Sequence, residues 1–307
     1  MFIHRLQSGR IQIMNSAIKL HKLTKYYARG KILGVKNLSL EVESGEIFGF
    51  IGPNGAGKST TIRLILDLIR PTSGQIEVFG MDSHKQSTSI KKMLGFLPGE
   101  IFLPENMSGE ECLNFYAGFK SEIDRKYLQS LIERFELNLA KKVGDYSKGN
   151  KQKLAIILAM MHKPRLLILD EPTSGLDPLN QQEFYNLIKE TKKWGATVFF
   201  STHILEEAQK LCDRVGIIKS GKLLTIENID QFKEKNIRDI HLETGETIPL
   251  AKLEFPGIQK IERTTYGYHL VTIGKNSKII QHLAKLPFDD ITINQPSLDE
   301  LFMRYYK

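Results

Sequence analysis

The sequence predicts an α/β fold in which a parallel sheet is followed by a second, smaller α+β domain. Two apolar runs, at 165–170 and 196–201, flank a stretch of helical spacing at 179–194. Strand, helix, strand is the order that pairs strands in parallel through a right-handed crossover. Residues 104–163 are helical in character, and short strand patterns return beyond residue 227. We therefore expect a parallel sheet with a helical insertion and a separate C-terminal unit.

Domain boundaries follow from these changes in pattern. We predict an N-terminal tail at 1–16, a core domain at 17–226 with a helical subdomain at about 104–163, and a small α+β domain at 227–307. A chain of 307 residues suits two domains, and its 41% hydrophobic and 25% charged residues are ordinary globular values.

The first eighty residues predict four strands and one helix. The strands are expected at 17–23, 35–43, 46–51 and 75–79. A loop that contains Tyr26, Tyr27 and Gly30 joins the first two strands. The helix has its apolar spacing at 61–69, and a turn at 71–74 follows it.

Three helices are predicted in the insertion. Ser108 and Glu111 have the spacing of a capping box at the start of the first helix. An amphipathic face marks the second helix and consists of Leu128, Leu131, Ile132 and Phe135. Ser147 is placed to cap a third helix that runs to about His162.

The C-terminal domain predicts four strands and two helices. The strands are expected near 238–243, 258–264, 268–273 and 290–294. One helix is expected after Ser277, and another after the capping pair Ser297 and Glu300.

A complete phosphate-binding loop lies between the predicted strand at 46–51 and the predicted helix at 61–69. Its nine residues are Gly52, Pro53, Asn54, Gly55, Ala56, Gly57, Lys58, Ser59 and Thr60. The glycines allow backbone N–H groups to turn towards the β- and γ-phosphates, which then lie at a helix N-terminus. Lys58 brings a positive charge to the phosphates, and the Ser59 hydroxyl is suited to ligate Mg²⁺. The loop predicts a P-loop NTPase core that binds a nucleoside triphosphate.

Asp170 and Glu171 follow directly on the apolar residues of the run at 165–170. A carboxylate at the end of a buried strand is able to hold Mg²⁺ or its water shell, and the next carboxylate is able to accept a proton from an attacking water. On its own, an apolar run that ends in two acids most often marks only a strand end. Because the phosphate loop lies 112 residues upstream, we favour Asp170 as a metal ligand and Glu171 as the general base.

The segment Tyr146–Lys153 begins the third helix of the insertion with basic residues. Lys148 and Lys151 oppose the helix dipole, which favours acidic residues at this end. A bound anion would resolve the conflict, and a solvated basic helix start is the plainer alternative. The segment lies about 20 residues before Asp170, and this combination favours the anion.

Three further positions have both a plain and a functional interpretation. His203 follows the strand at 196–201, where a histidine is usually structural or solvated; close to a γ-phosphate it would hold water and phosphate in place. Ser174–Asp177 has the composition of an ordinary turn. Tyr27 is able to stack on a base, although a tyrosine before a core strand more often packs against its neighbours.

The net charge of +8 is concentrated at the N-terminus. The first 30 residues carry six basic side chains and no acidic one, which indicates either a solvated tail or attraction to an anionic membrane surface. Basic residues interleaved with aromatic ones do not occur as a stripe, so we do not expect nucleic acid as a partner. Residues 1–13 precede Met14, and the sequence leaves open whether they belong to the native chain.

Cysteine usage and hydropathy suit a cytoplasmic chain. Cys112 and Cys212 are too few for a disulfide scaffold or a metal site and fit a reducing compartment. The longest apolar run, 154–161, falls well short of the roughly 20 residues that a membrane-spanning helix needs. Residues 1–13 are too short and too broken for a signal peptide.

Taken in order, these motifs resemble those of the ATP-binding subunits of ABC transporters over roughly residues 17–225. The phosphate loop resembles the Walker A motif of that family, and 166–171 resembles Walker B with its catalytic glutamate. Tyr146–Asn150 stands where the family has its LSGGQ signature, and Ser174–Asp177 where it has its D-loop.

The resemblance also implies roles for single residues. His203 corresponds to the switch histidine and completes a catalytic set with Glu171 and Lys58. Tyr27 corresponds to the aromatic residue that stacks on adenine. Ser147 and Gly149 are the two signature residues that would meet a γ-phosphate.

The sequence departs from the family pattern at two positions. Lys148 adds a charge to the signature where the family has glycine. The Q-loop glutamine of the family is missing: after the run 96–98, where the resemblance implies this glutamine, the chain has Gly99 and Glu100. Either Glu100 takes over the metal-binding and permease-sensing role, or that role is weakened.

The resemblance implies ATP and Mg²⁺ as cofactors and a mechanism based on a dimer. Two ATP molecules would each lie between the Walker A motif of one subunit and the signature of the other, in an expected homodimer or, alternatively, a heterodimer. Closure would drive a separate membrane permease, so the chain would lie peripherally at the cytoplasmic face of the cell membrane. The run 296–302 is similar to the C-terminal extension of drug-resistance exporter subunits, which implies export.

Two other functions remain open at this stage. Soluble ABC ATPases that act on ribosomes or DNA carry two nucleotide domains or a long coiled coil, and this sequence has one phosphate loop and no sustained heptads. A non-catalytic nucleotide sensor is disfavoured by the intact Lys58, Asp170, Glu171 and His203, although the altered signature and Q-loop leave room for it.

Overall fold

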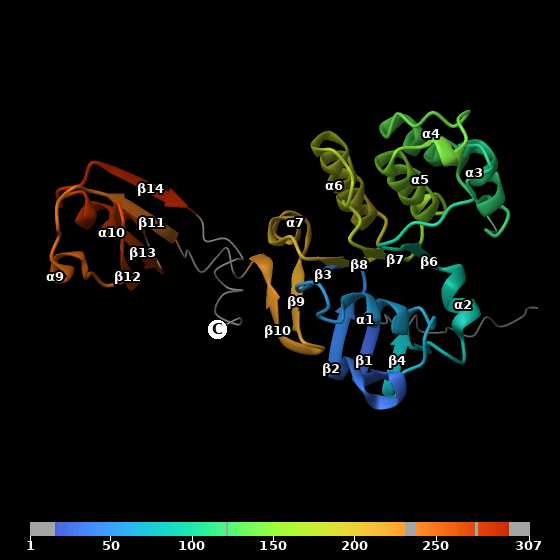
Figure 1. The fold of residues 1–307 in the computed structure, drawn as a ribbon, viewed down its shortest axis with the longest axis horizontal. Coiled ribbons are helices and arrows are strands. Elements are labelled where there is room, and N and C mark those ends of the chain that lie inside the picture. Colours follow the sequence, from blue (N-terminus) through green and yellow to red (C-terminus); the bar gives the residue numbers. More distant parts are fainter. Residues whose placement is uncertain (1–15, 121, 231–237, 274–275, 295–307) are drawn as a thin grey trace, which may run out of the picture.

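The computed structural model describes residues 16–120, 122–230, 238–273 and 276–294. Their strands form three sheets (Figure 1). Apart from Ser16, the predicted tail at 1–16 lies outside the described residues, and so does the helix predicted after Ser297 and Glu300.

The first sheet is antiparallel and contains the earliest strands of the chain. β1 (Ser16–Tyr27) pairs with β2 (Ile32–Glu43) and with β4 (Ser73–Val78), and the short β5 (Met81–Asp82) lies at the edge. A 3₁₀ turn at Ala28–Gly30 joins β1 to β2. Buried and exposed residues alternate along the second half of β2, as in a sheet with one face on the core.

The second sheet is the central one, and it is parallel except at one edge. In spatial order its strands are β10 (Lys222–Asn228), β9 (Arg214–Lys219), β3 (Ile47–Ile51), β8 (Thr197–Thr202), β7 (Leu166–Asp170) and β6 (Leu94–Leu97). Only β10 pairs antiparallel, with β9. The predicted parallel pairing of two strands around a helix is confirmed by β7, α6 (Pro178–Lys193) and β8.

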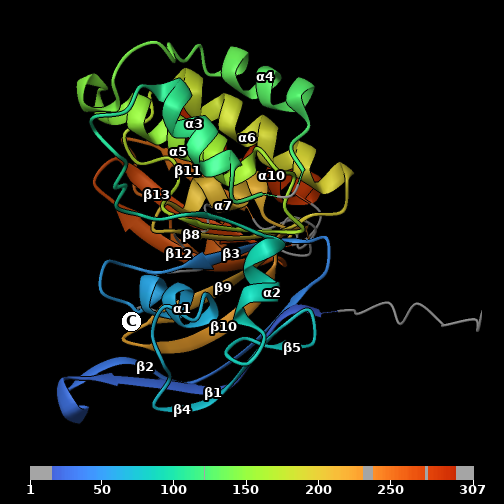
Figure 2. The ribbon, with the colours of Figure 1, turned by 90° about the vertical axis from the view of Figure 1, so that its right-hand side faces the viewer.

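Alternate residues of β3 face two different hydrophobic cores. Phe48 and Phe50 pack with the first sheet and with α1 (Lys58–Ile65), whereas Ile47 and Ile51 pack on the side of the helices. Figure 2 shows the resulting layers, with the central sheet between the first sheet and the helices. The end of β3, where the phosphate loop begins, therefore lies between two packed layers.

Three helices of the insertion form a layer beside the central sheet. They are α3 (Gly109–Ala117), α4 (Arg125–Arg134) and α5 (Lys148–Met160), with a 3₁₀ turn at Val143–Asp145. The predicted capping box is present, because Ser108 Oγ accepts from the N–H of Glu111 (3.1 Å) and Glu111 Oε2 accepts from the N–H of Ser108 (2.7 Å). Ser147 caps α5 as predicted. In the described parts of the chain, no helix has the length and apolar character needed to cross a bilayer.

Two shorter helices complete the core. α2 (Ser87–Lys92) precedes β6, and α7 (Leu205–Leu211) follows β8.

The third sheet stands apart from the other two (Figure 1). Its spatial order is β12 (Ile258–Thr264), β13 (Gly267–Thr272), β11 (Arg238–Glu243) and β14 (Asp290–Asn294). α9 (Leu250–Leu253) and α10 (Asn276–Leu283) contribute side chains to a hydrophobic core that contains residues of this unit only. All four strands lie within one residue of their predicted positions, whereas the boundary near residue 227 stays a prediction.

Several local predictions were wrong. Tyr26 and Tyr27 belong to β1 and not to a loop, because they pair with Leu33 and Ile32 of β2 and extend the hairpin. The predicted helix at 61–69 begins and ends earlier, as α1, and Asp67 in a left-handed conformation (φ +54°) follows its end.

The hairpin of β9 and β10 was missed by sequence analysis. Its strands are joined at Ser220 and Gly221, and both of these residues have positive φ. A two-residue turn that ends in glycine was the available signal.

Candidate functional site

The phosphate-binding loop connects β3 to α1, as its sequence predicts. Gly55 and Gly57 have φ angles of +76° and +110°, in the region that favours glycine. A Cβ atom at Gly52 would lie 2.3 Å from the carbonyl oxygen of Ile218, so no larger residue fits without a shift of the backbone. The loop therefore has the glycine-dependent backbone that close approach of a phosphate requires.

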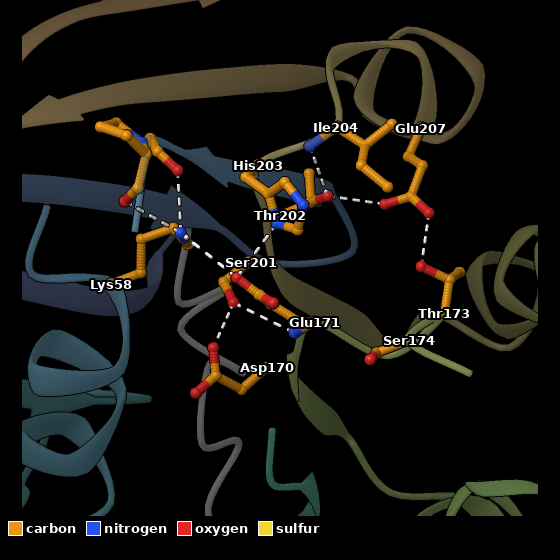
Figure 3. Close-up of polar contacts among 12 residues, drawn as sticks. Lys58, Asp170, Glu171, Thr173, Ser174, Ser201, Thr202, His203, Ile204 and Glu207 are labelled. Atoms are coloured by element: carbon orange, nitrogen blue, oxygen red, sulfur yellow. Dashed lines mark hydrogen bonds and ion pairs between the residues drawn. The ribbon is translucent and has the colours of Figure 1, made fainter. Parts of the chain in front are cut away.

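Lys58 is buried at the start of α1, beside this loop. Its Nζ donates to the carbonyl oxygens of Gly52 (2.8 Å) and Pro53 (3.2 Å). The same atom lies 3.4 Å from Oε1 of Glu171 (Figure 3). The ammonium group thus lies between the loop and a carboxylate from the central sheet.

Glu171 contacts the two other predicted catalytic residues. Its φ of +48° is uncommon for a residue with a side chain and typical of functional sites. Its N–H donates to the carbonyl oxygen of Ser201 (3.1 Å), and its Oε1 lies 3.2 Å from Nδ1 of His203. Because Glu171 contacts both Lys58 and His203, the three residues form one cluster (Figure 3).

Asp170 is buried at the end of β7, where Ser201 Oγ donates to its Oδ1 (2.5 Å). Together with Ser59, Glu100 and Glu171 it lines a cavity of about 460 Å³. No group of three or more His, Cys, Asp or Glu side chains that would hold a metal occurs among the residues described. Mg²⁺ in nucleotide sites usually binds one or two carboxylates together with substrate phosphates, and this donor set fits that pattern.

A second cavity of about 320 Å³ adjoins the first at the phosphate loop, since both are lined by Ser59 and Glu171. Tyr27 and Ile32 line its apolar part, and the hydroxyl of Tyr27 lies 3.2 Å from Oγ1 of Thr60. An apolar end and a polar, glycine-rich end are what a base and its phosphates require.

Ser147 and Gly149 line neither of these cavities. They lie at the start of α5, where a Cβ atom at Gly149 would be 3.0 Å from the carbonyl oxygen of Gly175. Lys148 Nζ donates to Ser174 Oγ at 3.4 Å. The signature segment therefore packs against the turn at 174–177 of its own chain, and the structure does not bring it to Lys58.

The basic residues at the start of α5 have acceptors within the chain. Lys151 Nζ pairs with Glu105 (2.8 Å), and Lys153 Nζ donates to the carbonyl oxygen of Phe135 (3.0 Å). These contacts offset part of the conflict between the basic residues and the helix dipole. A bound anion near Ser147 stays a prediction.

Sequence analysis missed three residues that support the site. They are Ser201, which donates to Asp170; Gln152, whose Nε2 donates to the carbonyl oxygen of Pro172 (2.5 Å); and the buried Glu207 of α7. A polar residue within an apolar strand was a signal for Ser201. Gln152 and Glu207 are recognisable only from the segments that the fold brings to them.

Comparisons with known proteins agree with this geometry. Residues 35–174 match the family model described as ABC transporter. The chain is 40% identical over 301 residues to the bacitracin transport ATP-binding protein BcrA of Bacillus licheniformis, which covers 95% of this chain and 97% of BcrA. It is 37% identical to the probable multidrug ABC transporter ATP-binding protein YbhF of Escherichia coli (strain K12), over 73% of this chain and 39% of YbhF.

Solved structures give the same assignment. The ATP-binding subunit of an ABC transporter superposes with a TM-score of 0.66 and 30% identity, over 71% of this chain and 92% of the other. A dimeric post-hydrolysis state of the ATP-binding cassette MJ0796, bound to ADP and Pi, superposes with a TM-score of 0.63 and 26% identity, over 69% of this chain and 98% of the other. The chain therefore belongs to the family of ABC transporter ATP-binding proteins, which bind and hydrolyse ATP.

Proposed function

We propose that two copies of this chain close around two ATP molecules and their Mg²⁺ ions. The observation that carries the proposal is the separation of Ser147 and Gly149 from the cavities at Lys58. One chain contains both halves of a nucleotide site but does not join them, so a second copy supplies the missing half. A dimer of an ATP-binding cassette among the similar solved structures supports this arrangement.

Within each site the residues have separate roles. The N–H groups of the loop and Lys58 bind the phosphates, and Tyr27 contacts the base. An incoming phosphate competes with Glu171 for Lys58, which leaves the carboxylate available to accept a proton from the attacking water. His203 orients that carboxylate through its Nδ1 and contacts the terminal phosphate when ATP is bound.

Mg²⁺ would be held by Ser59 and Asp170, with Glu100 on the wall of the same cavity. When bound, the ion neutralises charge on the phosphates. The contribution of the chain is to orient one hydroxyl and one buried carboxylate, and the hydrogen bond from Ser201 fixes the latter.

We propose a separate membrane permease as the partner, with export as the direction. Exposed aromatic side chains support a partner surface, since Phe102 is 83% and Phe119 71% exposed, and Phe119 packs edge to face on Phe115 at 5.2 Å. Phe102 also lines the cavity that contains Glu100, which would couple the partner to the metal site. The names of BcrA and YbhF, which speak of bacitracin transport and of a probable multidrug transporter, support a drug as the cargo, and the chain would then lie peripherally at the cytoplasmic face of the membrane.

The solution mass of the Glu171→Gln protein tests the dimer. Removing the proposed base keeps ATP binding and stops turnover, so closed dimers should accumulate. We expect a dimer with ATP, and a monomer with ADP or without nucleotide, by multi-angle light scattering. The Lys58→Ala/Glu171→Gln double variant is the matched control and should stay monomeric. A Glu171→Gln protein that binds ATP and remains a monomer would contradict the homodimer.

A further inference from the structure

Glu207 is a buried carboxylate that none of the roles above explains. It lies on α7, is 3% exposed, and accepts hydrogen bonds from three hydroxyl groups. Its Oε1 accepts from Thr173 Oγ1 (2.5 Å) and from the hydroxyl of Tyr185 (3.3 Å), and its Oε2 accepts from Thr202 Oγ1 (2.6 Å). A buried carboxylate is costly unless its oxygens are satisfied, so donors that converge from three segments indicate an arrangement that the fold maintains.

The hydrogen bond to Thr202 fixes the loop that carries His203 (Figure 3). Thr202 Oγ1 donates to Glu207 and at the same time accepts from the N–H of Ile204 (2.9 Å). His203 lies between these two anchored residues, and its Nδ1 is 3.2 Å from Oε1 of Glu171. The backbone on both sides of His203 is therefore held through the Thr202 hydroxyl, which donates to Glu207.

The hydrogen bond to Thr173 joins Glu207 to the segment that follows Glu171. Thr173 is buried and directly precedes Ser174, whose Oγ accepts from Lys148. A displacement of this segment thus acts on Glu207 through one hydrogen bond of 2.5 Å. In Figure 3 the Glu207 carboxylate lies between the Thr173 side and the Thr202 side of the site.

We propose that Glu207 is a positioning residue that holds His203 in contact with Glu171. The position of Glu207 depends in turn on the position of the segment that contains Thr173. The inference rests on the proposed function, because the signature and the turn that begins at Ser174 would lie at the face that the second subunit closes. Closure of the dimer displaces this segment, and Glu207 conveys the displacement to the loop of His203. Glu207 acts through Thr202 and does not contact the nucleotide.

The test measures kcat and KM for ATP in Glu207→Gln, Thr173→Val and Thr202→Val, all in the full-length chain. Each replacement keeps the volume of the side chain and removes either the charged acceptor or a hydroxyl donor. We expect each to lower kcat by about 10- to 100-fold, the usual loss when a partner that orients a functional group is removed. KM for ATP should change by less than about twofold, because the phosphate loop is untouched. Thr173→Ser and Thr202→Ser keep the hydroxyl and should restore kcat.

A double variant separates positioning from a general loss of stability. Glu207 and Thr173 act along one path, so Glu207→Gln/Thr173→Val should have a kcat within about twofold of the slower single variant. Tyr185→Phe is the matched control, because it removes the third donor to Glu207 from α6 without touching either loop. We expect it to lower the midpoint of thermal unfolding and to leave kcat unchanged.

Two results would overturn the inference alone: an unchanged kcat in Glu207→Gln, or effects of the two replacements that multiply in the double variant. If Glu207→Gln does not fold, the two threonine series and their serine rescues decide the question. Glu171→Gln and the wild type are measured alongside. Hydrolysis by the wild type that is lost in Glu171→Gln leaves the proposed function standing, whatever Glu207→Gln does. Normal turnover in Glu171→Gln would instead overturn the proposed function and this inference with it.

Discussion

Glu100 lines the same cavity as Ser59, Asp170 and Glu171, so three acidic side chains border the region where Mg²⁺ would bind. The resemblance to ABC ATP-binding proteins implies a glutamine at this place, and the amide of a glutamine offers a neutral oxygen. A carboxylate attracts a divalent cation more strongly than an amide does. We therefore infer that Glu100 strengthens metal binding in this chain.

Replacing Glu100 tests its charge directly. Glu100→Ala should raise the Mg²⁺ concentration for half-maximal ATP hydrolysis by about tenfold, the lower end of losses seen when a group that supports a metal site is removed. Glu100→Gln restores the family residue and should have a smaller effect. A Mg²⁺ titration of hydrolysis at saturating ATP measures both. The same Mg²⁺ dependence in all three proteins would show that Glu100 has no part in metal binding.

A functional residue can be predicted from the sequence when the residues that it acts with lie close to it in the chain. The phosphate loop was predicted because its glycines, Lys58 and Ser59 act within one short segment of fixed spacing. The role of Glu207 could not be predicted from the sequence, because its partner Thr173 lies 34 residues away and contacts it only after β7, α6 and β8 have packed. The positive φ of Glu171, which aims its carboxylate at Lys58, is likewise a property of the folded backbone.

Among the elements, α5 begins at the signature segment and ends two residues before His162, a half-buried histidine whose Nδ1 atom is shielded from solvent. The Nε2–H of His162 donates to the carbonyl oxygen of Leu94 (3.1 Å), and its Nδ1 has no hydrogen-bond partner among the described residues. Burial, together with the positive charge of Lys120, lowers the pKa of His162 from its usual 6.5 to about 4.

This shift predicts a loss of stability in mild acid. Between pH 6.5 and about 4, the unfolded chain protonates His162 while the folded chain does not, so the free energy of unfolding falls as the pH drops through this window. His162→Gln removes the titrating group. Urea unfolding at about pH 7.5 and about pH 5 should show a larger drop in the wild type than in the variant. An equal drop in both proteins would place the pH dependence elsewhere.

Elements with strong local signals were predicted well, and those defined by pairing were not. The caps at Ser108 and Ser147 mark the starts of α3 and α5 because each hydroxyl bonds within its own first turn. β6 is only four residues long and exists as a strand because it pairs with β7. The extension of β1 through Tyr27 depends in the same way on its pairing with β2.

For the molecule as a whole, the third sheet has its own hydrophobic core, while Val271 of β13 belongs to the cluster on the helical side of the central sheet. The predicted C-terminal domain thus has a hydrophobic cluster of its own, and Val271 is its residue in the cluster of the core. The residues that form the two cavities all lie between Tyr27 and Glu171. Nucleotide binding should therefore depend little on this unit.

A chain that ends after residue 230 tests this division. We expect its Kd for ATP to lie within about twofold of the full-length value, since every cavity-lining residue is retained. Its midpoint of thermal unfolding should fall modestly, because the packing of Val271 is lost. Nucleotide titration and thermal unfolding measure the two quantities. Loss of ATP binding in a folded truncated chain would contradict the predicted boundary near 227.

The separation of Ser147 from Lys58 also has a genetic consequence. In a dimer, a Lys58→Ala subunit still offers an intact signature, and a Ser147→Ala subunit still offers an intact phosphate loop. A mixed dimer of these two defective proteins would contain one intact site, formed by the phosphate loop of one subunit and the signature of the other, as in complementation between alleles of a single gene. After random mixing of equal amounts, half of the dimers are mixed and each has one intact site of two, so about a quarter of wild-type turnover should return if each site hydrolyses ATP independently. No hydrolysis by the mixture, when exchange of subunits is verified, would mean that the two sites hydrolyse ATP only together.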